Sequence, residues 1–306
     1  MIEQGYDLVG DIHGHADALH RLLRQLGYAD VEGAFRHPAR RMIFVGDFID
    51  RGPEQREVLR TVRAMCEAGV ASAVMGNHEF NAIGWATGDG DGGFLRPHTE
   101  KNTHQHAEFL RQIKAGSSDH AEAIGWFRSL PVWIDLPGLR VVHACWHDPS
   151  RAALLPFLDK RGCLTDEGIR ESYRGESDAK AAADILLKGP EQRLPRGVHF
   201  HDKDGHKRDE VRLRWWNPEA TTFRKAAIEM DGREHELPDT SLPRDYRYLE
   251  REPVFFGHYW LSGTPVITAP NAACLDFSVA KQGHLTAYRW SGEGALSAAN
   301  LAFVAA

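Results

Sequence analysis

The sequence predicts an α/β fold, sandwich-like in architecture, with central mixed β-sheets flanked by helices and a metal site at the carboxyl ends of the strands. Two observations lead to this prediction. Short apolar runs alternate along the chain with amphipathic stretches of helical spacing, which is typical of α/β proteins. Several of these runs also end abruptly in polar, ionisable residues, and such residues form the functional loops at the edge of a sheet.

Four apolar runs are predicted to be buried strands. They are YDLVG before Asp11, RMIFVG before Asp47, ASAVMG before Asn77 and LRVV before His143. Amphipathic stretches follow the first three; residues 18–26, for example, carry four leucines on one face at helical spacing. Strand character returns in PVFFGH and in HLTAYRW, where the alternation of residue types indicates a sheet edge or a hairpin.

Residues 1–306 are expected to form a single domain that carries an insertion, or cap, over residues 149–252. This middle region is rich in charges and prolines, unlike the segments on either side of it. Within it, Ala179–Lys188 is predicted to form a helix that a Gly-Pro pair stops. Asp202–Gly205 is predicted to form a turn between two short strands.

The overall composition disfavours several classes of partner. A formal charge of −6 argues against a broad basic surface for nucleic acid. The first residues lack the pattern of a signal peptide, and no stretch is apolar for long enough to span a bilayer, so we expect a cytoplasmic protein without a membrane partner. The oligomeric state is left open. The four cysteines are widely spaced and are expected to be reduced thiols: Cys66, Cys145, Cys163 and Cys274.

Residue types that bind metals recur directly after the predicted strands. They are Asp11 and His13 in GDIHG, Asp47 and Asp50 in GDFIDRG, Asn77 and His78 in GNHE, and later His143 and His258. A mixture of carboxylate, carboxamide and imidazole ligands suits manganese, iron or zinc better than calcium. Two cations roughly 3.5–4 Å apart can share a bridging carboxylate and a bridging water that is nucleophilic near neutral pH. Asp47 is the candidate for the bridging carboxylate.

A glycine precedes four of these residues, namely Asp11, Asp47, Asn77 and His258. Glycine lets the backbone turn sharply and approach a metal without a clash of its Cβ. One glycine before a polar residue is ordinary turn chemistry, but four of them, each after an apolar strand, indicate a shared site.

These motifs resemble those of the calcineurin-like metallophosphoesterases, in particular the branch that contains phosphoprotein phosphatases and diadenosine tetraphosphate hydrolases. GDIHG, GDFIDRG, GNHE, VVHA and FGH match in order, over residues 7–148 and 253–290. The resemblance implies two divalent metal ions, with manganese expected and iron or zinc as alternatives. It implies that one ion is held by Asp11, His13 and Asp47, and the other by Asp47, Asn77, His143 and His258.

The resemblance also implies catalytic and substrate-binding residues. His78 resembles the general acid that protonates the leaving oxygen, and Asp50 would orient its imidazole. Arg51 would clamp two phosphate oxygens. A second phosphate-binding arginine is expected before the last strands, and Arg214 and Arg224 are both candidates.

Several other polar and aromatic residues have an ordinary interpretation that we favour. His15, His147 and Asp148 lie close to the motifs but are expected to be solvated loop residues. The histidines of the middle region, His199, His201 and His206, are expected on the surface. Trp215 and Trp216 are expected to pack in the interior rather than to stack on a nucleobase or a tyrosine ring.

The predicted function is hydrolysis of phosphate monoesters by attack of a metal-bridging water, most simply by an enzyme of the protein phosphatase type. The substrate would be a phosphoprotein, a small phosphate ester or a nucleotide. The main alternative is a dinucleoside polyphosphate hydrolase, because FGHYW and LTAYRW are similar to that branch as well. An inactive scaffold protein is the weakest alternative, because every expected ligand is present.

Overall fold

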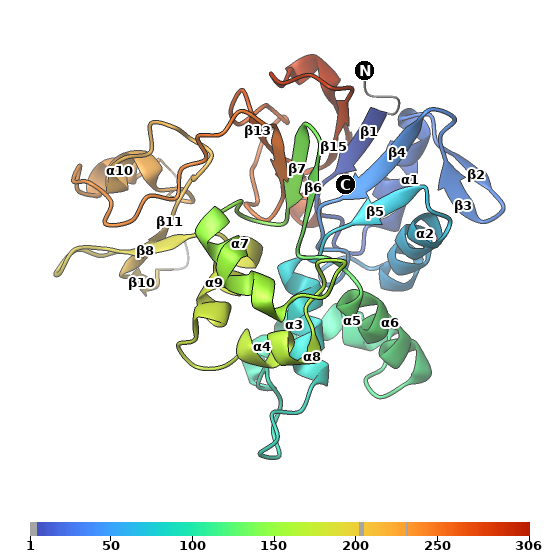
Figure 1. Cartoon of the computed structure of the whole chain (residues 1–306), viewed down its shortest axis with the longest axis horizontal. Coiled ribbons are helices and arrows are strands. Elements are labelled where there is room, and N and C mark those ends of the chain that lie inside the picture. Colours follow the sequence, from blue (N-terminus) through green and yellow to red (C-terminus); the bar gives the residue numbers. More distant parts are fainter. Residues whose placement is uncertain (1–4, 202–204, 231) are drawn as a thin grey trace.

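The computed structural model describes residues 5–201, 205–230 and 232–306, and it contains two β-sheets that pack face to face with helices on their outer sides (Figure 1). The first sheet has the order β14-β15-β1-β4-β5, and β16 also pairs with β15. The second has the order β13-β12-β7-β6. The predicted mixed sheets flanked by helices are therefore confirmed.

The strands of the first sheet are β1 (Gly5–Val9), β4 (Arg40–Phe44), β5 (Ala71–Ala73), β14 (Asp276–Phe277), β15 (His284–Trp290) and β16 (Leu301–Ala305). Those of the second are β6 (Trp133–Leu136), β7 (Leu139–Val142), β12 (Val254–Phe256) and β13 (Ala272–Cys274). All the predicted strands are present. The HLTAYRW run, β15, does form hairpins, but it is not an edge strand, because β1 and β14 pair with it on one side and β16 pairs with it on the other.

The parallel pairs of strands determine where the loops meet. β1, β4 and β5 run parallel, and so do β7 and β12 in the second sheet. The carboxyl ends of these two groups lie together, so the loops after them come from two sheets rather than from the edge of one sheet.

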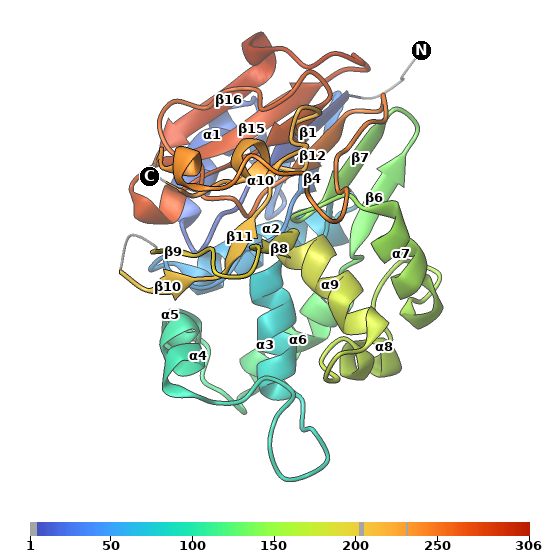
Figure 2. The same cartoon turned by 90° about the vertical axis from the view of Figure 1, so that its left-hand side faces the viewer.

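The two faces of the first sheet bury different side chains, as the twofold period of a strand requires. Leu8 and Ile43 point towards the second sheet, where they join Val141 and Phe255 in an apolar layer. Their neighbours point the other way, into a larger cluster that includes helices α1 (Ala16–Gln25) and α2 (Gln55–Glu67). Helices α3 (Asn77–Ala86), α4 (Glu100–Gln105), α5 (Ala107–Gln112) and α6 (Ser118–Arg128) lie beyond the carboxyl ends of the strands (Figure 2). A small hairpin, β2 (Ala29–Val31) and β3 (Ala34–Arg36), packs on α2.

The middle region contains short elements in succession. They are α7 (Asp148–Leu154), η1 (Leu155–Phe157), α8 (Asp166–Glu171), α9 (Asp178–Lys188), β8 (Glu191–Arg193), β9 (Phe200–His201), β10 (Lys207–Arg208), β11 (Glu210–Arg212), α10 (Phe223–Ala226) and η2 (Glu234–Glu236). The predicted helix is α9, which ends at Gly189 with φ 77°. Residues 202–204 of the predicted turn lie outside the described residues, and the strands on either side of it, β9 and β10, pair antiparallel.

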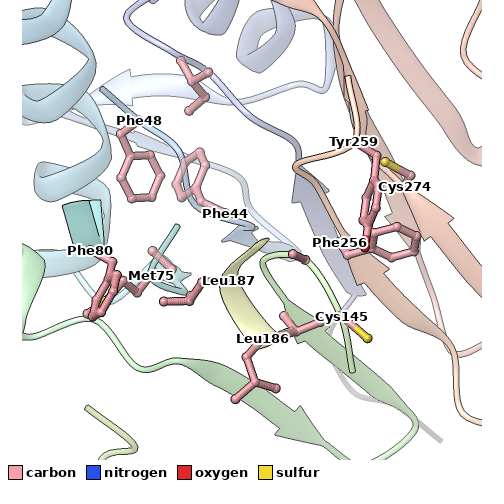
Figure 3. Close-up of a cluster of buried hydrophobic side chains, with 14 of the residues drawn as sticks. Phe44, Phe48, Met75, Phe80, Cys145, Leu186, Leu187, Phe256, Tyr259 and Cys274 are labelled. Carbon is pink, nitrogen blue, oxygen red and sulfur yellow. The ribbon is translucent and has the colours of Figure 1, made fainter. Parts of the chain in front are cut away.

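This middle region shares the core of the rest of the molecule. Leu186 and Leu187 of α9 are fully buried, and Figure 3 shows them in the same cluster as Phe44, Phe80 and Phe256. Trp215 and Trp216 are 1% and 5% exposed, so the prediction that they pack is confirmed. The remaining short helices, η3 (Val279–Lys281) and η4 (Ala298–Asn300), flank β15.

Two predictions about the whole chain can be compared with the structure. Each of the four cysteines is a free thiol, and all but Cys66 are buried. Within the described residues, the helices are too short or too polar to cross a bilayer.

Candidate metal centre

The predicted metal ligands converge on the Asp47 carboxylate. Its Oδ2 atom lies 3.4 Å from Nε2 of His143 and 3.7 Å from Nε2 of His13. Asp47 and both imidazoles are at most 2% exposed. Asp47 follows β4, His13 follows β1 and His143 follows β7, so the loops of both sheets meet here.

Asn77 and His258 complete the side of this cluster that faces the second sheet. Asn77 Oδ1 lies 3.0 Å from Nε2 of His143 and 2.8 Å from Nδ1 of His258. The backbone N–H of His258 donates to Oδ2 of Asp11 over 2.9 Å, which ties the loop after β12 to the loop after β1. All six predicted ligands therefore lie in one cluster.

The residues of the cluster fit divalent cations. Oδ1 of Asp11 and Nε2 of both His13 and His258 are buried without a hydrogen-bond partner among the described residues. Two groups of ligand atoms, each within 4.8 Å of one another, share Asp47: one contains His13 and His78, the other His143 and His258. Buried carboxylates are costly without a counter-charge. Burial and the neighbouring Asp276 indeed raise the pKa of Asp11 well above its ordinary value.

The loops that carry these residues adopt unusual backbone conformations. His13, Asp47 and His258 have φ values of 46°, 53° and 76°, in the left-handed region that non-glycine residues seldom occupy. Asp50 and Arg51, at 69° and 71°, do the same. Such conformations cost about 1–3 kcal/mol each and persist where the surroundings enforce them, most often at functional sites.

Glu79, the last residue of GNHE, is one of the groups that hold these loops. Its carboxylate is fully buried and accepts hydrogen bonds from the backbone N–H groups of Asp47, Phe48 and Gly76, over 2.8–3.1 Å. Burial, together with the charge of Asp47, raises the pKa of Glu79 to about 7. Glu79 was not assigned a role from the sequence.

The glycines before the ligands allow the close approach that was predicted. A Cβ added to Gly257 would overlap the Asp11 carboxylate, and one added to Gly76 would overlap Asp47. Added Cβ atoms at Gly10 and Gly46 would collide with backbone atoms of neighbouring loops.

His78 lies beside the cluster and is held by Asp50. Its Nδ1 atom is 2.6 Å from Oδ2 of Asp50, and its Nε2 atom is 3.9 Å from Oδ2 of Asp47. Burial lowers the pKa of His78, but the carboxylates of Asp47 and Asp50 outweigh burial, so its pKa is raised above the ordinary value. Oδ1 of Asp50 is bonded to a second histidine, His106, that the sequence analysis did not identify.

Asn77 and His258 of the cluster, together with His78, line a cleft of about 870 Å³. Its lining residues come mainly from helices α3 and α4 and from α9, β8 and β11, whose arrangement can be followed in Figure 2. The cleft contains seven basic side chains, of which Arg51 was predicted: Arg51, Arg96, Lys101, Lys180, Lys188, Arg212 and Arg244.

The structure places both candidates for the second phosphate-binding arginine outside the cleft. Arg214 donates to the carbonyl of Ala227 and contacts Glu234, and Arg224 donates to the carbonyl of Leu237. Arg212 lines the cleft instead. Its charge lowers the pKa of His258, second only to the effect of burial.

Trp260, in the loop after β12, also faces the cleft. Its ring stacks on His13 with centroids 5.1 Å apart, and the guanidinium of Arg51 lies 5.7 Å from its centroid. Its backbone N–H donates to the buried carboxylate of Asp276 over 2.7 Å. Neither Trp260 nor Asp276 was singled out from the sequence.

The other histidines lie away from the cluster. His15, His147 and Asp148 are partly or fully exposed and do not line the cleft. The histidines of the middle region are exposed, as predicted: His199, His201 and His206.

The sequence and the fold are similar to those of known proteins. The sequence model of the calcineurin-like phosphoesterases matches residues 7–258. The chain belongs to the calcineurin-like phosphoesterase family. This confirms the resemblance found in the motifs, and the match extends across the whole of the middle region, residues 149–252.

Two relatives of this calcineurin-like phosphoesterase are both named bis(5'-nucleosyl)-tetraphosphatase (asymmetrical). The protein from Halalkalibacterium halodurans is 45% identical over 74 residues, which cover 24% of this chain and 30% of that protein. The protein from Oceanobacillus iheyensis is 28% identical over 156 residues, which cover 51% of this chain and 60% of that protein. The matched segments thus span less than two thirds of either relative.

A solved structure shares the fold. A protein serine/threonine phosphatase from Saccharomyces cerevisiae superposes with a TM-score of 0.53 at 15% sequence identity, over 99% of this chain and 79% of that chain.

Proposed function

We propose that this protein is a metal-dependent hydrolase that cleaves a phosphorus–oxygen bond of a phosphate ester or anhydride. The observation that carries the proposal is the Asp47 carboxylate, which belongs to two groups of ligand atoms at once, beside a histidine held by a carboxylate. Asp11, His13 and Asp47 would hold one ion, and Asp47, Asn77, His143 and His258 the other. Two such cations supply the Lewis acidity that makes a water nucleophilic and neutralises phosphoryl oxygens.

The chain's own residues would divide the remaining work. Arg51 and Arg212 would bind the non-reacting phosphate oxygens and orient the phosphorus. One water oxygen would bond to phosphorus as the bond to the leaving oxygen breaks. His78 would donate the proton on Nε2 to that leaving oxygen, and Asp50 would keep the ring in place by accepting from Nδ1.

The lining of the cleft supports a substrate with several negative charges. Seven basic side chains lie along it, against the three carboxylates of Asp50, Asp184 and Glu191. The partly exposed rings of Tyr173 and Trp260 also line it, and a nucleobase could pack against them. A dinucleoside polyphosphate combines these features, and two relatives carry the name of such an activity. We therefore place this substrate class first.

A phosphomonoester is the second candidate, and the Asp50–His78 pair favours it. A polyphosphate leaving group departs with little protonation, whereas the alkoxide of serine or threonine needs a proton. A buried histidine that is held by a carboxylate and has a raised pKa suits the poorer leaving group.

A substrate panel tests the proposal. Diadenosine tetraphosphate, a phosphoserine peptide and an aryl phosphate are incubated with the protein and Mn²⁺, and the products are identified by mass spectrometry. We expect turnover that chelation abolishes, with the highest kcat/KM for the dinucleotide. If none of the three substrates is hydrolysed with Mn²⁺, Fe²⁺ or Zn²⁺, the proposed function is refuted.

A further inference from the structure

Both oxygens of the Asp50 carboxylate are bonded by histidines. Oδ2 lies 2.6 Å from Nδ1 of His78, and Oδ1 lies 2.8 Å from Nδ1 of His106. Burial raises the pKa of Asp50, but the hydrogen bonds from His106 and His78 outweigh it and hold the pKa below its ordinary value. An ionised carboxylate only accepts hydrogen bonds, so each Nδ1 carries the proton and donates it.

His106 has no other polar role within the described chain. It lies between α4 and α5, where its ring stacks on Phe109 with centroids 4.8 Å apart and is tilted against Trp85. It is 5% exposed, and its Nε2 atom is buried without a hydrogen-bond partner among the described residues. The apolar contacts fix the ring, and its one side-chain hydrogen bond goes to Asp50.

We propose that His106 is a positioning residue, which fixes the Asp50 carboxylate so that Asp50 in turn holds His78 with its Nε2 directed at the leaving oxygen. The terminal torsion of an aspartate is soft, so a carboxylate bonded through one oxygen can rotate. A second hydrogen bond from a rigidly packed ring removes that freedom. The inference rests on the proposed role of His78 as proton donor.

This arrangement predicts a dependence on the leaving group. The proton from His78 matters most when the leaving oxygen is basic, as in phenyl phosphate, and least for 4-nitrophenyl phosphate. A change that only loosens the fold or the metal site would slow both reactions by the same factor. The ratio of the two rates therefore separates positioning of His78 from general damage.

The experiment compares two substitutions of His106. His106→Leu removes the donor at similar volume, whereas His106→Asn keeps an N–H close to the position of Nδ1. We expect His106→Leu to lower kcat for phenyl phosphate by ~10–100-fold, and for 4-nitrophenyl phosphate by less than about threefold. His106→Asn should recover most of the loss. His106→Phe, which retains the ring contacts, replaces His106→Leu if that variant does not fold.

His120→Leu is the matched control. His120 is also buried, has an unpartnered Nε2 within the described residues and contacts Phe109, but it is not bonded to Asp50. His120→Leu should leave the ratio of the rates with phenyl phosphate and 4-nitrophenyl phosphate unchanged. Metal content and melting temperature are measured for every variant.

A double-mutant cycle checks that His106 acts through His78. In a His78→Asn background, His106→Leu should cause no further loss with phenyl phosphate, because the group it positions is already absent. Equal losses with both esters, no recovery in His106→Asn, or an undiminished effect in the His78→Asn background would overturn the proposal.

A measurement that does not need turnover separates this proposal from the proposed function. At a pH above the pKa of His78, where the ring has lost one proton and is neutral, its ¹⁵N shifts report which nitrogen carries the remaining proton. We expect one tautomer, protonated on Nδ1, in the wild type and in His106→Asn, and a mixture in His106→Leu. If the wild type hydrolyses neither ester nor diadenosine tetraphosphate, the proposed function fails, and an unchanged His78 tautomer in His106→Leu would still overturn the role of His106 by itself.

Discussion

The loops that follow β1, β4 and β5 and the region of residues 149–252 contribute to the same cleft in different ways. In the loops, side chains next to one another in the sequence also lie together in space, on a backbone with positive φ angles and glycines that fit against neighbouring atoms. In the middle region, the basic residues of the cleft are scattered over α9, β11 and the segment around residue 244. The proposed metal centre is thus encoded locally, whereas the part of the cleft that the middle region lines depends on long-range packing.

The largest effect should come from the loop after β4. Asp47→Asn keeps the size of the side chain but removes the charge that both ligand groups share. We expect kcat/KM to fall by ~10³-fold or more, because two cations contribute several kcal/mol to transition-state stabilisation. Steady-state kinetics with an aryl phosphate measure the change. Asp209→Asn, at an exposed ion pair of the middle region, is the control and should keep the wild-type rate. A wild-type rate in Asp47→Asn as well would show that the two regions do not differ in their contribution to activity.

His78→Ala should have the next largest effect. It removes the proton donor but leaves the six proposed ligands in place, so kcat should fall by ~10²–10³-fold with a basic leaving group, while metal content stays at the wild-type level. Rates with phenyl phosphate and metal analysis of the purified variant check both statements. If His78→Ala loses one metal instead, His78 is a ligand, as its closeness to Asp47 would also allow.

Substitutions at two arginines test the contribution of the middle region to substrate binding. Arg212 lines the cleft and Arg214 does not, although they are two residues apart. We expect Arg212→Ala to lower kcat/KM by ~10–100-fold, since a hydrogen bond to a charged group contributes ~1.5–3 kcal/mol. Arg214→Ala should change kcat/KM by less than about threefold, because substitutions away from the site usually have small effects. Equal effects of both substitutions would show that the packing of β11 does not select the substrate-binding arginine.

The smallest effect is expected at the exposed histidines of the middle region. His201→Ala should leave metal content, kcat/KM and melting temperature at wild-type values, because His201 is exposed and lies outside both groups of ligand atoms. Loss of a bound metal in His201→Ala would reveal a further site in this region.

The sequence predicted the ligand cluster well because each part of it is local. GDIHG, GDFIDRG and GNHE each combine an apolar strand, a glycine and polar residues within a few positions, so the strand ends alone bring Asp11, Asp47 and Asn77 together. The sequence predicted more than one sheet but not that the strands before His143 and His258 form the second one, because the pairing of β7 with β12 joins residues far apart in the chain.

The residues that the sequence analysis missed depend on tertiary contacts. His106 lies between two short helices and reaches Asp50 only because of their packing. Arg212 and Arg214 are two residues apart, yet Arg212 lines the cleft whereas Arg214 contacts Ala227 and Glu234 outside it. No local pattern distinguishes these residues from ordinary helix and strand residues.

The amount of Mn²⁺ bound per chain, determined by equilibrium dialysis and metal analysis, tests the central claim most directly. The convergence of loops from two sheets on Asp47 predicts two ions in the wild type, one in His13→Ala and one in His258→Ala. A wild-type protein that binds no Mn²⁺, or two ions retained in both variants, would contradict it.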